Sequence, residues 1–250
     1  MKISATVITL NEERNIARCI TSLKKLADEI IVLDSNSTDR TREIATEQGA
    51  IVHTMDWEGY SKSKNYLNNL AKYEYILSLD ADEAIDAELE DIILREKHKG
   101  LSGAYSVNRL TNYCGKWIRH SGWYPDRKVR LFPKARTQWT GEYVHEELEL
   151  SSGVEVQDLG GHVEHYSYYS YKEHRERADK YSALTAKKMH AKGKKAHALK
   201  PALSAIGRFI SMYIFKLGFL DGKMGWKIAT ISAASNVFKY KELRRLNSGK

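Results

Sequence analysis

The sequence predicts an α/β fold, in which a mainly parallel sheet carries helices on both faces and is followed by a basic helical appendage. Short apolar runs alternate with amphipathic stretches as far as residue 99, as in β-α-β units with right-handed crossovers. After Ser170 this alternation stops and helical periodicity takes over. We therefore expect two domains, residues 1–165 and residues 166–250.

The elements of the first domain follow from their periodicity. Apolar or alternating runs rich in β-branched residues predict strands at residues 2–10, 29–33, 51–55 and 75–80. Apolar residues recurring at intervals of three and four predict a helix through Ile16 to Leu26, and further helices are expected at residues 41–48 and 62–72. Asn11 is expected to cap the first helix, and Gly49 to end the second. The carboxyl ends of the first, second and fourth strands then line one crevice.

The charge is distributed unevenly along the chain. The formal net charge is +8, but residues 166–250 hold 19 lysines and arginines against five acids, which leaves residues 1–165 at −6. A basic half of this kind binds polyanions, and without a nucleic-acid-binding motif an anionic membrane surface is the favoured partner. A solvated basic helical face is the alternative.

The cysteines, the amino terminus and the lengths of the apolar runs indicate the cellular compartment. Cys19 and Cys114 form neither a disulfide framework nor a zinc pattern, and the amino terminus reads as a strand rather than a signal sequence. No apolar run reaches the length of a membrane span. We expect a cytoplasmic protein, peripheral on the inner face of the cytoplasmic membrane.

The most informative stretch is Tyr75 to Glu83. An apolar strand ends there in Asp80 and Asp82, at the sheet edge where open α/β proteins bind ligands. Two carboxylates two residues apart can hold Mg²⁺ or Mn²⁺ and leave positions free for substrate phosphates. The alternative is that one of them only caps a following helix whose first turns are acidic.

Three motifs in this order, "VITLNEE", "DSNSTDRT" and "LDADE", resemble the nucleotide-sugar half of family 2 glycosyltransferases, which have the GT-A fold. The resemblance covers roughly residues 1–165 and implies a UDP-sugar donor and a divalent metal. The positions it assigns to nucleotide-sugar binding are Thr9, Asn11, Glu12, Asp34, Asp39, Lys64, Asp80 and Ala81. Taken singly, Asp39 also fits a turn residue and Lys64 a solvated helix lysine.

The same resemblance suggests the remaining site residues. An inverting transfer needs one carboxylate to take the proton of the acceptor hydroxyl. The "VHE" sequence resembles the family loop that supplies this base, which points to Glu146, with Glu142 and Glu147 as alternatives. Asp82 is expected to bind the metal directly. His165 resembles a late histidine that completes the metal site, although a lone histidine is also common in cores and on surfaces.

Residues 100–139 are rich in aromatic and basic side chains. Trp117, Trp123 and Trp139 are suited either to stacking against sugars or to a small core. The "RKVRLF" segment resembles one that precedes the acceptor loop of the family, and its bases are candidates for contacting a diphosphate or an anionic acceptor.

The carboxyl-terminal half is expected to be helical. Helices are predicted at residues 173–191 and 226–240, and residues 203–215 suit an amphipathic helix at a membrane interface. The alternative is a helical hairpin that packs on the catalytic domain or on a second chain, so that a homo-oligomer is left open.

The segment "FKLGFLDGKMGW" and the order of "YVHE" and "HYSYYS" resemble lipopolysaccharide core β-1,4-glucosyltransferases. This implies transfer of a hexose, glucose from UDP-glucose, to an inner-core heptose or a similar lipid-linked glycan. A transferase of another envelope polysaccharide is the alternative. A sugar nucleotidyltransferase is disfavoured because "TLNEERN" lacks a glycine-rich phosphate loop, and a non-catalytic membrane-binding module is the remaining option.

Overall fold

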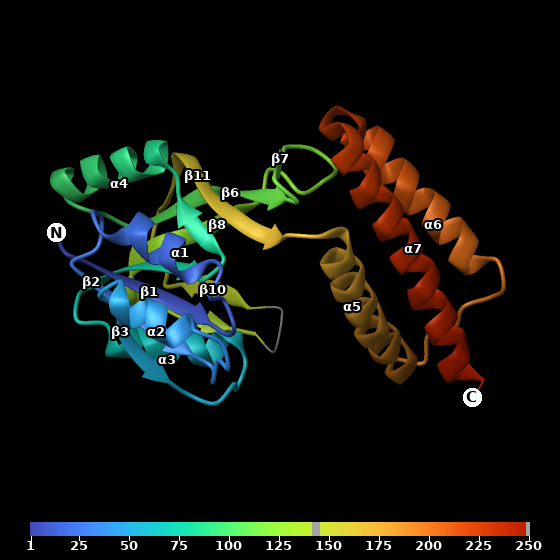
Figure 1. The fold of residues 1–250 in the computed structure, drawn as a ribbon, viewed down its shortest axis with the longest axis horizontal. Coiled ribbons are helices and arrows are strands. Elements are labelled where there is room, and N and C mark those ends of the chain that lie inside the picture. Colours follow the sequence, from blue (N-terminus) through green and yellow to red (C-terminus); the bar gives the residue numbers. More distant parts are fainter. Residues whose placement is uncertain (142–145, 249–250) are drawn as a thin grey trace. The chain divides into compact units, whose positions relative to one another are not determined.

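The computed structural model describes residues 1–141 and 146–248, which pack as two compact units (Figure 1). Unit 1 comprises Met1–Arg109 and Asp126–Tyr166, and unit 2 comprises Leu110–Pro125 and Ser167–Lys250. The domain boundary expected from the sequence lies between residues 165 and 166. The structure adds the excursion of residues 110–125 to the carboxyl-terminal unit.

The main sheet has the strand order β3-β2-β1-β4-β8-β6-β11-β5. Its parallel part consists of β1 (Ile3–Thr9), β2 (Glu29–Asp34), β3 (Ile51–Thr54) and β4 (Tyr75–Asp80). The other strands are β8 (Arg127–Pro133), β6 (Ala104–Tyr113), β11 (Val156–Tyr168), β5 (Glu83–Ile85) and β7 (Lys116–Ile118). β8 pairs antiparallel with β4 and with β6. The α/β fold class is thus confirmed, with a parallel half and an antiparallel extension.

Helices cover both faces of the sheet, as predicted. One face packs against α1 (Ile16–Leu23), α2 (Thr41–Glu47) and α4 (Ala87–Lys99) through alternate strand residues such as Ala5 and Val7. The other face meets α3 (Tyr60–Leu70) and the hairpin of β9 (Thr137–Thr140) and β10 (Glu147–Leu150). Each fully buried aliphatic side chain contributes about 1.5–3 kcal/mol, so the period of two in these strands fixes their register.

The start of α4 rules out an alternative role for the acids, and the start of α1 corrects one expected cap. α4 begins after Asp86, whose carboxylate accepts the Leu89 N–H at 2.8 Å, so neither Asp80 nor Asp82 is its cap. α1 begins only at Ile16, and Asn11 is not its cap. Asn11 instead has a φ of +54° and hydrogen-bonds to the next loop, a conformation that asparagine tolerates better than most residues.

Unit 2 is built from helices. α5 (Tyr171–Ala191) starts with a capping box between Ser170 and Glu173. α6 (Lys200–Ile210) runs into a π-helical turn η2 (Ser211–Phe215), and a 3₁₀ turn η3 (Gly218–Asp221) leads into α7 (Gly222–Asn247). α7 packs against both α5 and α6, around a core that includes Tyr113, Met212 and Ile228.

In the part of the chain that the structure describes, no single helix is both long and apolar enough to cross a membrane. The pair Lys200–Phe215 and Gly218–Asn247, bent by 73°, passes the same test of length and composition when taken together.

Candidate active site

The first part of the site is formed by the ends of β1 and β2. Thr9 lies opposite Asp34 in the parallel register. The Asp34 carboxylate is buried and accepts hydrogen bonds from the Ser37 N–H, at 2.8 Å, and from the Ser37 hydroxyl. The Thr9 hydroxyl is buried beside it and has no hydrogen-bond partner among the residues that the structure describes. A buried polar atom without a partner costs about 1–3 kcal/mol, so this edge has hydrogen-bonding capacity for a ligand.

Hydrogen bonds join the two polar loops to each other. The Asn11 N–H donates to the Ser37 hydroxyl oxygen, and the Thr38 N–H donates to the Asn11 carboxamide oxygen, both at 2.8 Å. The Glu12 N–H donates to the Thr41 hydroxyl oxygen at 2.8 Å. The loops after β1 and β2 therefore form one unit at the sheet edge.

Asp39 is used within this loop unit. Its carboxylate accepts hydrogen bonds from the Thr41 N–H at 3.0 Å and from the Glu13 N–H at 3.1 Å. Partial burial raises the pKa of Asp39, but these hydrogen bonds outweigh that effect and leave its pKa lowered. Asp39 thus fixes the shape of the loop.

The end of β4 brings Asp80 to the same edge, because Asp80 lies opposite Ile8 in the register. Its carboxylate is 3.1 Å from the Lys64 ammonium group and 3.5 Å from the Arg130 guanidinium group. Burial by itself raises the pKa of Asp80. The positive charges of Lys64 and Arg130 lower the pKa by more than burial raises it, so the net pKa is below its usual value and the group stays ionised. We call residues 80–83 the acidic turn. The Ala81 N–H donates to the Ile8 carbonyl at 3.2 Å, which connects the acidic turn to β1.

A buried ion-pair network, which was not expected from the sequence, lies behind Asp80. Glu83 is almost inaccessible, pairs with Arg130, and lies 3.5 Å from Arg109. Its other oxygen accepts the Asp80 N–H at 3.1 Å. Burial by itself lowers the pKa of Arg130. The negative charges of Glu83 and Asp80 raise the pKa by more than burial lowers it, so the net pKa is raised. The one signal in the sequence was an arginine within an otherwise apolar strand end.

The other bases of the "RKVRLF" segment are directed elsewhere. Arg127 pairs with Asp158, and the Lys128 ammonium is 3.4 Å from the Asp126 carboxylate. Of these three bases, Arg130 is the one that contacts the acidic turn.

Asp82 and His165 form the candidate metal pair. The Asp82 carboxylate is 3.2 Å from Nε2 of His165, and both side chains are partly accessible. The Tyr166 N–H donates to the Asp82 carbonyl at 2.8 Å, which fixes β11 beside the acidic turn. Within residues 1–141 and 146–248, no group of three or more histidine, cysteine or acidic residues is arranged to hold a metal. The described residues thus offer two candidate ligands here, one oxygen and one nitrogen.

Lys64 connects the acidic turn to Glu146. The Lys64 ammonium is buried, 3.7 Å from the Glu146 carboxylate and 4.5 Å from the centre of the Trp139 ring. The alternative of a solvated helix lysine is therefore ruled out. Of the competing acids, Glu147 is exposed at the start of β10, and Glu142 lies outside the described residues.

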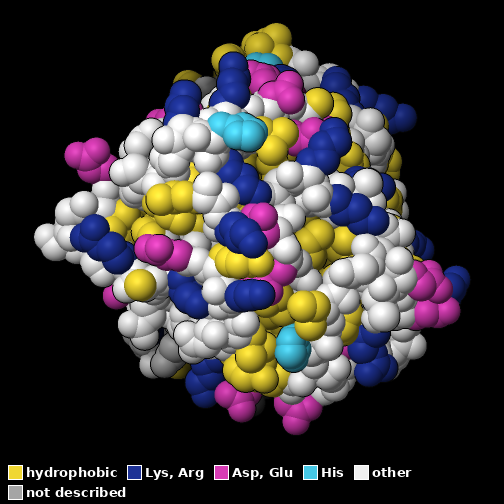
Figure 2. All heavy atoms as spheres, turned by 90° about the vertical axis from the view of Figure 1, so that its left-hand side faces the viewer, with side chains coloured by type: hydrophobic (Ala, Val, Ile, Leu, Met, Phe, Trp, Pro, Cys, Tyr) yellow, Lys and Arg dark blue, Asp and Glu magenta, His cyan; other side chains and the backbone are white. Residues whose placement is uncertain are grey.

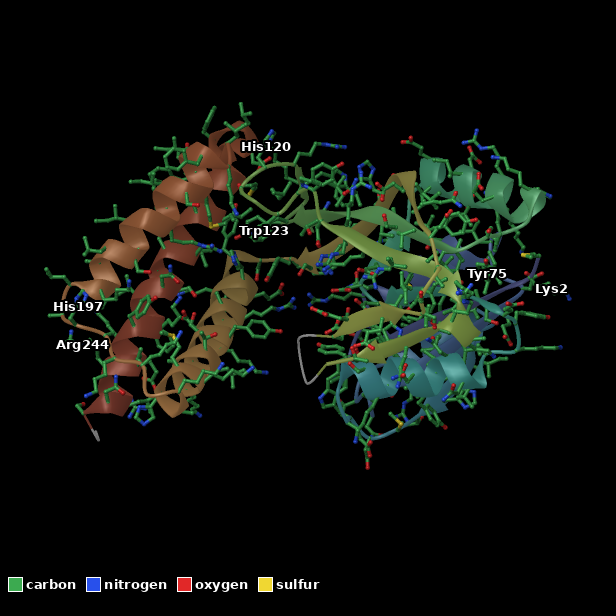
Figure 3. All side chains as sticks on the ribbon, turned by 180° about the vertical axis from the view of Figure 1, so that it is seen from behind. Lys2, Tyr75, His120, Trp123, His197 and Arg244 are labelled. Atoms are coloured by element: carbon green, nitrogen blue, oxygen red, sulfur yellow. The ribbon has the colours of Figure 1, made fainter. Side chains whose placement is uncertain are left out.

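Of the three tryptophans in residues 100–139, two pack against core residues. Trp139 packs in the unit 1 core with Phe132, and Trp123 packs in unit 2 against Tyr113 and His174. Figure 3 labels Trp123 and His120 on the loop after β7. Trp117 is half-buried on β7.

A cavity of about 320 Å³ lies at the opposite end of β4, beside Tyr75, Ser102 and Arg136. None of the candidate site residues lines this cavity, and Asp80 lies at the other end of β4.

Comparison with known proteins identifies the family of the chain. Residues 4–151 match the model of glycosyl transferase family 2. The chain is 30% identical to an uncharacterized glycosyltransferase of Rickettsia typhi over 98% of this chain and 88% of the relative. It is 25% identical to the lipopolysaccharide core biosynthesis glycosyltransferase LpsC of Rhizobium meliloti, over 94% and 91% respectively. The solved structure of S. aureus TarS 1-349 in complex with UDP-GlcNAc is 15% identical, with a TM-score of 0.49 over 100% of this chain and 93% of that one.

The chain belongs to glycosyl transferase family 2, since the family model covers more than half of its length. The resemblance of the three motifs is thereby confirmed at the level of the family.

Proposed function

We propose that the chain is a metal-dependent inverting glycosyltransferase that moves a hexose from a UDP-sugar, with UDP-glucose as the expected donor, to a lipid-linked glycan. The observation that carries this is the convergence of Asp34, Asp80 and Asp82 at one sheet edge, where the buried Thr9 hydroxyl at the end of β1 has no partner within residues 1–141 and 146–248. An inner-core heptose of lipopolysaccharide is the proposed acceptor. The name of the Rhizobium meliloti relative supports the lipopolysaccharide core as the acceptor class.

The nucleotide is proposed to bind where β1 and β2 end. Thr9 and Asp34 would hydrogen-bond to the uracil and ribose, because an acid after a Rossmann-like strand accepts from ribose hydroxyls. Asn11, Glu12 and Asp39 would shape this pocket through the loop contacts described above.

The residues at the acidic turn fit a divalent cation. Asp82 supplies a hard oxygen ligand and His165 a nitrogen ligand, a set suited to Mn²⁺ and less so to Mg²⁺. Diphosphate oxygens of the donor would complete the shell. When bound, the cation supplies neutralisation of the negative charge on the UDP leaving group.

Asp80 and Lys64 have a different task in this proposal. Asp80 is held by Lys64 and Arg130, so its orientation is fixed before the donor arrives. It would accept a hydrogen bond from the ribose, with Ala81 turning the chain toward Asp82.

Glu146 is the proposed base. Its carboxylate would take the proton of the acceptor hydroxyl as the acceptor oxygen forms a bond to the anomeric carbon. The bond from that carbon to the UDP oxygen breaks on the opposite face, so the anomeric configuration inverts. The Lys64 ammonium at 3.7 Å orients the Glu146 carboxylate.

The test is a donor screen with the purified full-length chain, Mn²⁺ and a heptose-bearing lipid acceptor. UDP release and the anomer of the product are measured for UDP-glucose, UDP-galactose and UDP-N-acetylglucosamine. We expect acceptor-dependent UDP release with one donor and an inverted product. Asp82→Ala should abolish transfer, whereas Asp91→Ala, an exposed acid on α4, should leave it unchanged. Full transfer by Asp82→Ala would contradict the metal assignment, and a retained anomer would contradict the mechanism.

A further inference from the structure

An unbroken apolar stripe runs along α6 and η2 in unit 2. The stripe consists of five exposed residues at helical intervals of four, three, four and four, namely Leu199, Leu203, Ile206, Ile210 and Ile214. At about 100° per residue, this spacing keeps them within roughly 80° of the helix circumference. Elsewhere on the same elements, Met212 is buried, and Ser204 accepts a hydrogen bond from the Asn236 carboxamide on α7 at 3.1 Å. In the part of the chain that the structure describes, the stripe is therefore the exposed face of these elements.

The stripe continues into the turn between η2 and α7. Phe215, Leu217, Phe219 and Leu220 are all exposed there, and Phe215 is 78% exposed. Trp226, on the first turns of α7, is also about half exposed. We call these five residues the apolar turn. Large apolar side chains so close together are unlike the scattered single residues of an ordinary soluble surface.

The apolar turn is held rigidly from behind. The buried Asp221 carboxylate accepts hydrogen bonds from the N–H groups of Arg119 and His120 and from the Ser121 hydroxyl, at 3.0–3.2 Å. A Cβ on Gly225 would lie 1.8 Å from the carbonyl oxygen of Gly218, so this close approach requires glycine. The exposed side chains thus project from a built turn.

Charge around this surface is of one sign. Between residues 180 and 241 the sequence has thirteen lysines and arginines and a single acid, Asp221, which is buried. Lys200, Arg208, Lys216 and Lys223 are exposed next to the stripe or the apolar turn. The face of the molecule in Figure 2, in contrast, mixes acidic and basic side chains.

We propose that the stripe and the apolar turn bind the surface of an anionic lipid bilayer, with α6 lying in the plane of the membrane. Apolar side chains enter the boundary between headgroups and acyl chains, and lysines meet the anionic headgroups, each adding about 1 kcal/mol near the surface. A second copy of the chain fits less well, because a symmetric contact would oppose like charges. This goes beyond the proposed function, since lipid binding by unit 2 does not depend on sugar transfer.

The test uses the full chain and flotation with vesicles of phosphatidylcholine, with or without phosphatidylglycerol. We expect binding to the vesicles that contain phosphatidylglycerol. Phe215→Ser with Leu220→Ser should weaken it about 10- to 100-fold, because two large apolar side chains no longer enter the bilayer. The matched control, Tyr181→Ser with Leu184→Ser, removes two exposed apolar residues of α5 and should leave binding unchanged. Lys216→Glu with Lys223→Glu should weaken binding to anionic vesicles.

A second measurement reports on the surface directly. Brominated lipids should quench tryptophan fluorescence, and the quenching should fall in Trp226→Phe. Absence of vesicle binding, or equal binding by the apolar-turn variant and its α5 control, would overturn the proposal. So would a dimer in sedimentation equilibrium that the apolar-turn substitutions dissociate, because a second copy would then cover the stripe.

Discussion

The buried ammonium group of Lys64 lies 3.1 Å from the carboxylate of Asp80, at the end of the central strand β4. Lys64 comes from α3 and Asp80 from the sheet, so this pair joins two elements at the candidate site. The ammonium also faces Trp139 and Glu146. Lys64 therefore shares with Arg130 the stabilisation of the ionised Asp80 carboxylate.

Replacing Lys64 should destabilise the protein measurably. Lys64→Met keeps a long apolar side chain but leaves the buried side of Asp80 with Arg130 alone, at 3.5 Å. We expect a loss of about 1–3 kcal/mol in the free energy of unfolding, measured with urea. Lys62→Met is the matched control, because Lys62 is exposed on the same helix and pairs with Glu58 at the surface. Its effect should stay below about 0.5 kcal/mol, and equal effects of the two variants would contradict the role of Lys64.

The difference in the free energy of unfolding between wild type and Lys64→Met should depend on pH. Lys64 and Arg130 hold the pKa of Asp80 below the ordinary value of about 4, against the effect of burial. A lowered carboxyl pKa stabilises the folded state above the unfolded pKa, and this is lost as the pH falls through the folded pKa. The stability gap should be constant from about pH 7 to 5 and should narrow below about pH 4. A gap that widens in acid would contradict this.

Glu146 and Glu147 should separate cleanly in transfer assays. Glu146→Gln removes the proposed base and should lower kcat by about 10²- to 10⁴-fold, while UDP still binds. Glu147→Gln, one residue further on an exposed strand end, should retain activity. If Glu147→Gln is the inactive variant, the assignment of the base moves by one residue.

His174 should titrate unusually low. It is buried in unit 2, with Nδ1 2.8 Å from the Tyr113 hydroxyl, and burial together with the charge of Arg177 lowers its pKa to about 4. The folded state favours the neutral imidazole, so the unfolded state binds the proton more readily. The free energy of unfolding should therefore be highest above about pH 6.5 and should fall by on the order of 3 kcal/mol as the pH falls toward 4. NMR titration of the imidazole checks the pKa, and His174→Phe should remove this part of the pH dependence. A titration near pH 6.5 would contradict the buried environment.

The parallel half of the fold was predictable because its signals are local. The apolar run before Asp80 and the alternation before Thr9 each specify a strand without reference to distant residues. The antiparallel strands β8, β6 and β11 were not assigned to the sheet, because their partners are far away in sequence. The same reason explains why residues 110–125 join unit 2, where Asp221 binds their backbone.

The site was predictable as a set of positions and less so as a set of contacts. Motif order brought Asp34, Asp80 and Asp82 to one edge, and the structure places them there. The burial of Lys64 and the pairing of Glu83 with Arg130 depend on how α3 and β8 pack, which one sequence does not encode locally. Lys64, Glu83 and Arg130 are charged residues that a sequence alone would place at the surface, but they are buried next to the acidic turn.

The central claim is that the edge formed by β1, β2 and β4 binds UDP together with a divalent cation held by Asp82. Titration calorimetry of UDP, with and without Mn²⁺, tests it on the wild type, Asp82→Asn and the control Asp91→Asn. We predict that Mn²⁺ tightens UDP binding about tenfold or more, and that Asp82→Asn alone loses this gain. UDP binding that is indifferent to Mn²⁺, or unchanged in Asp82→Asn, would contradict the account.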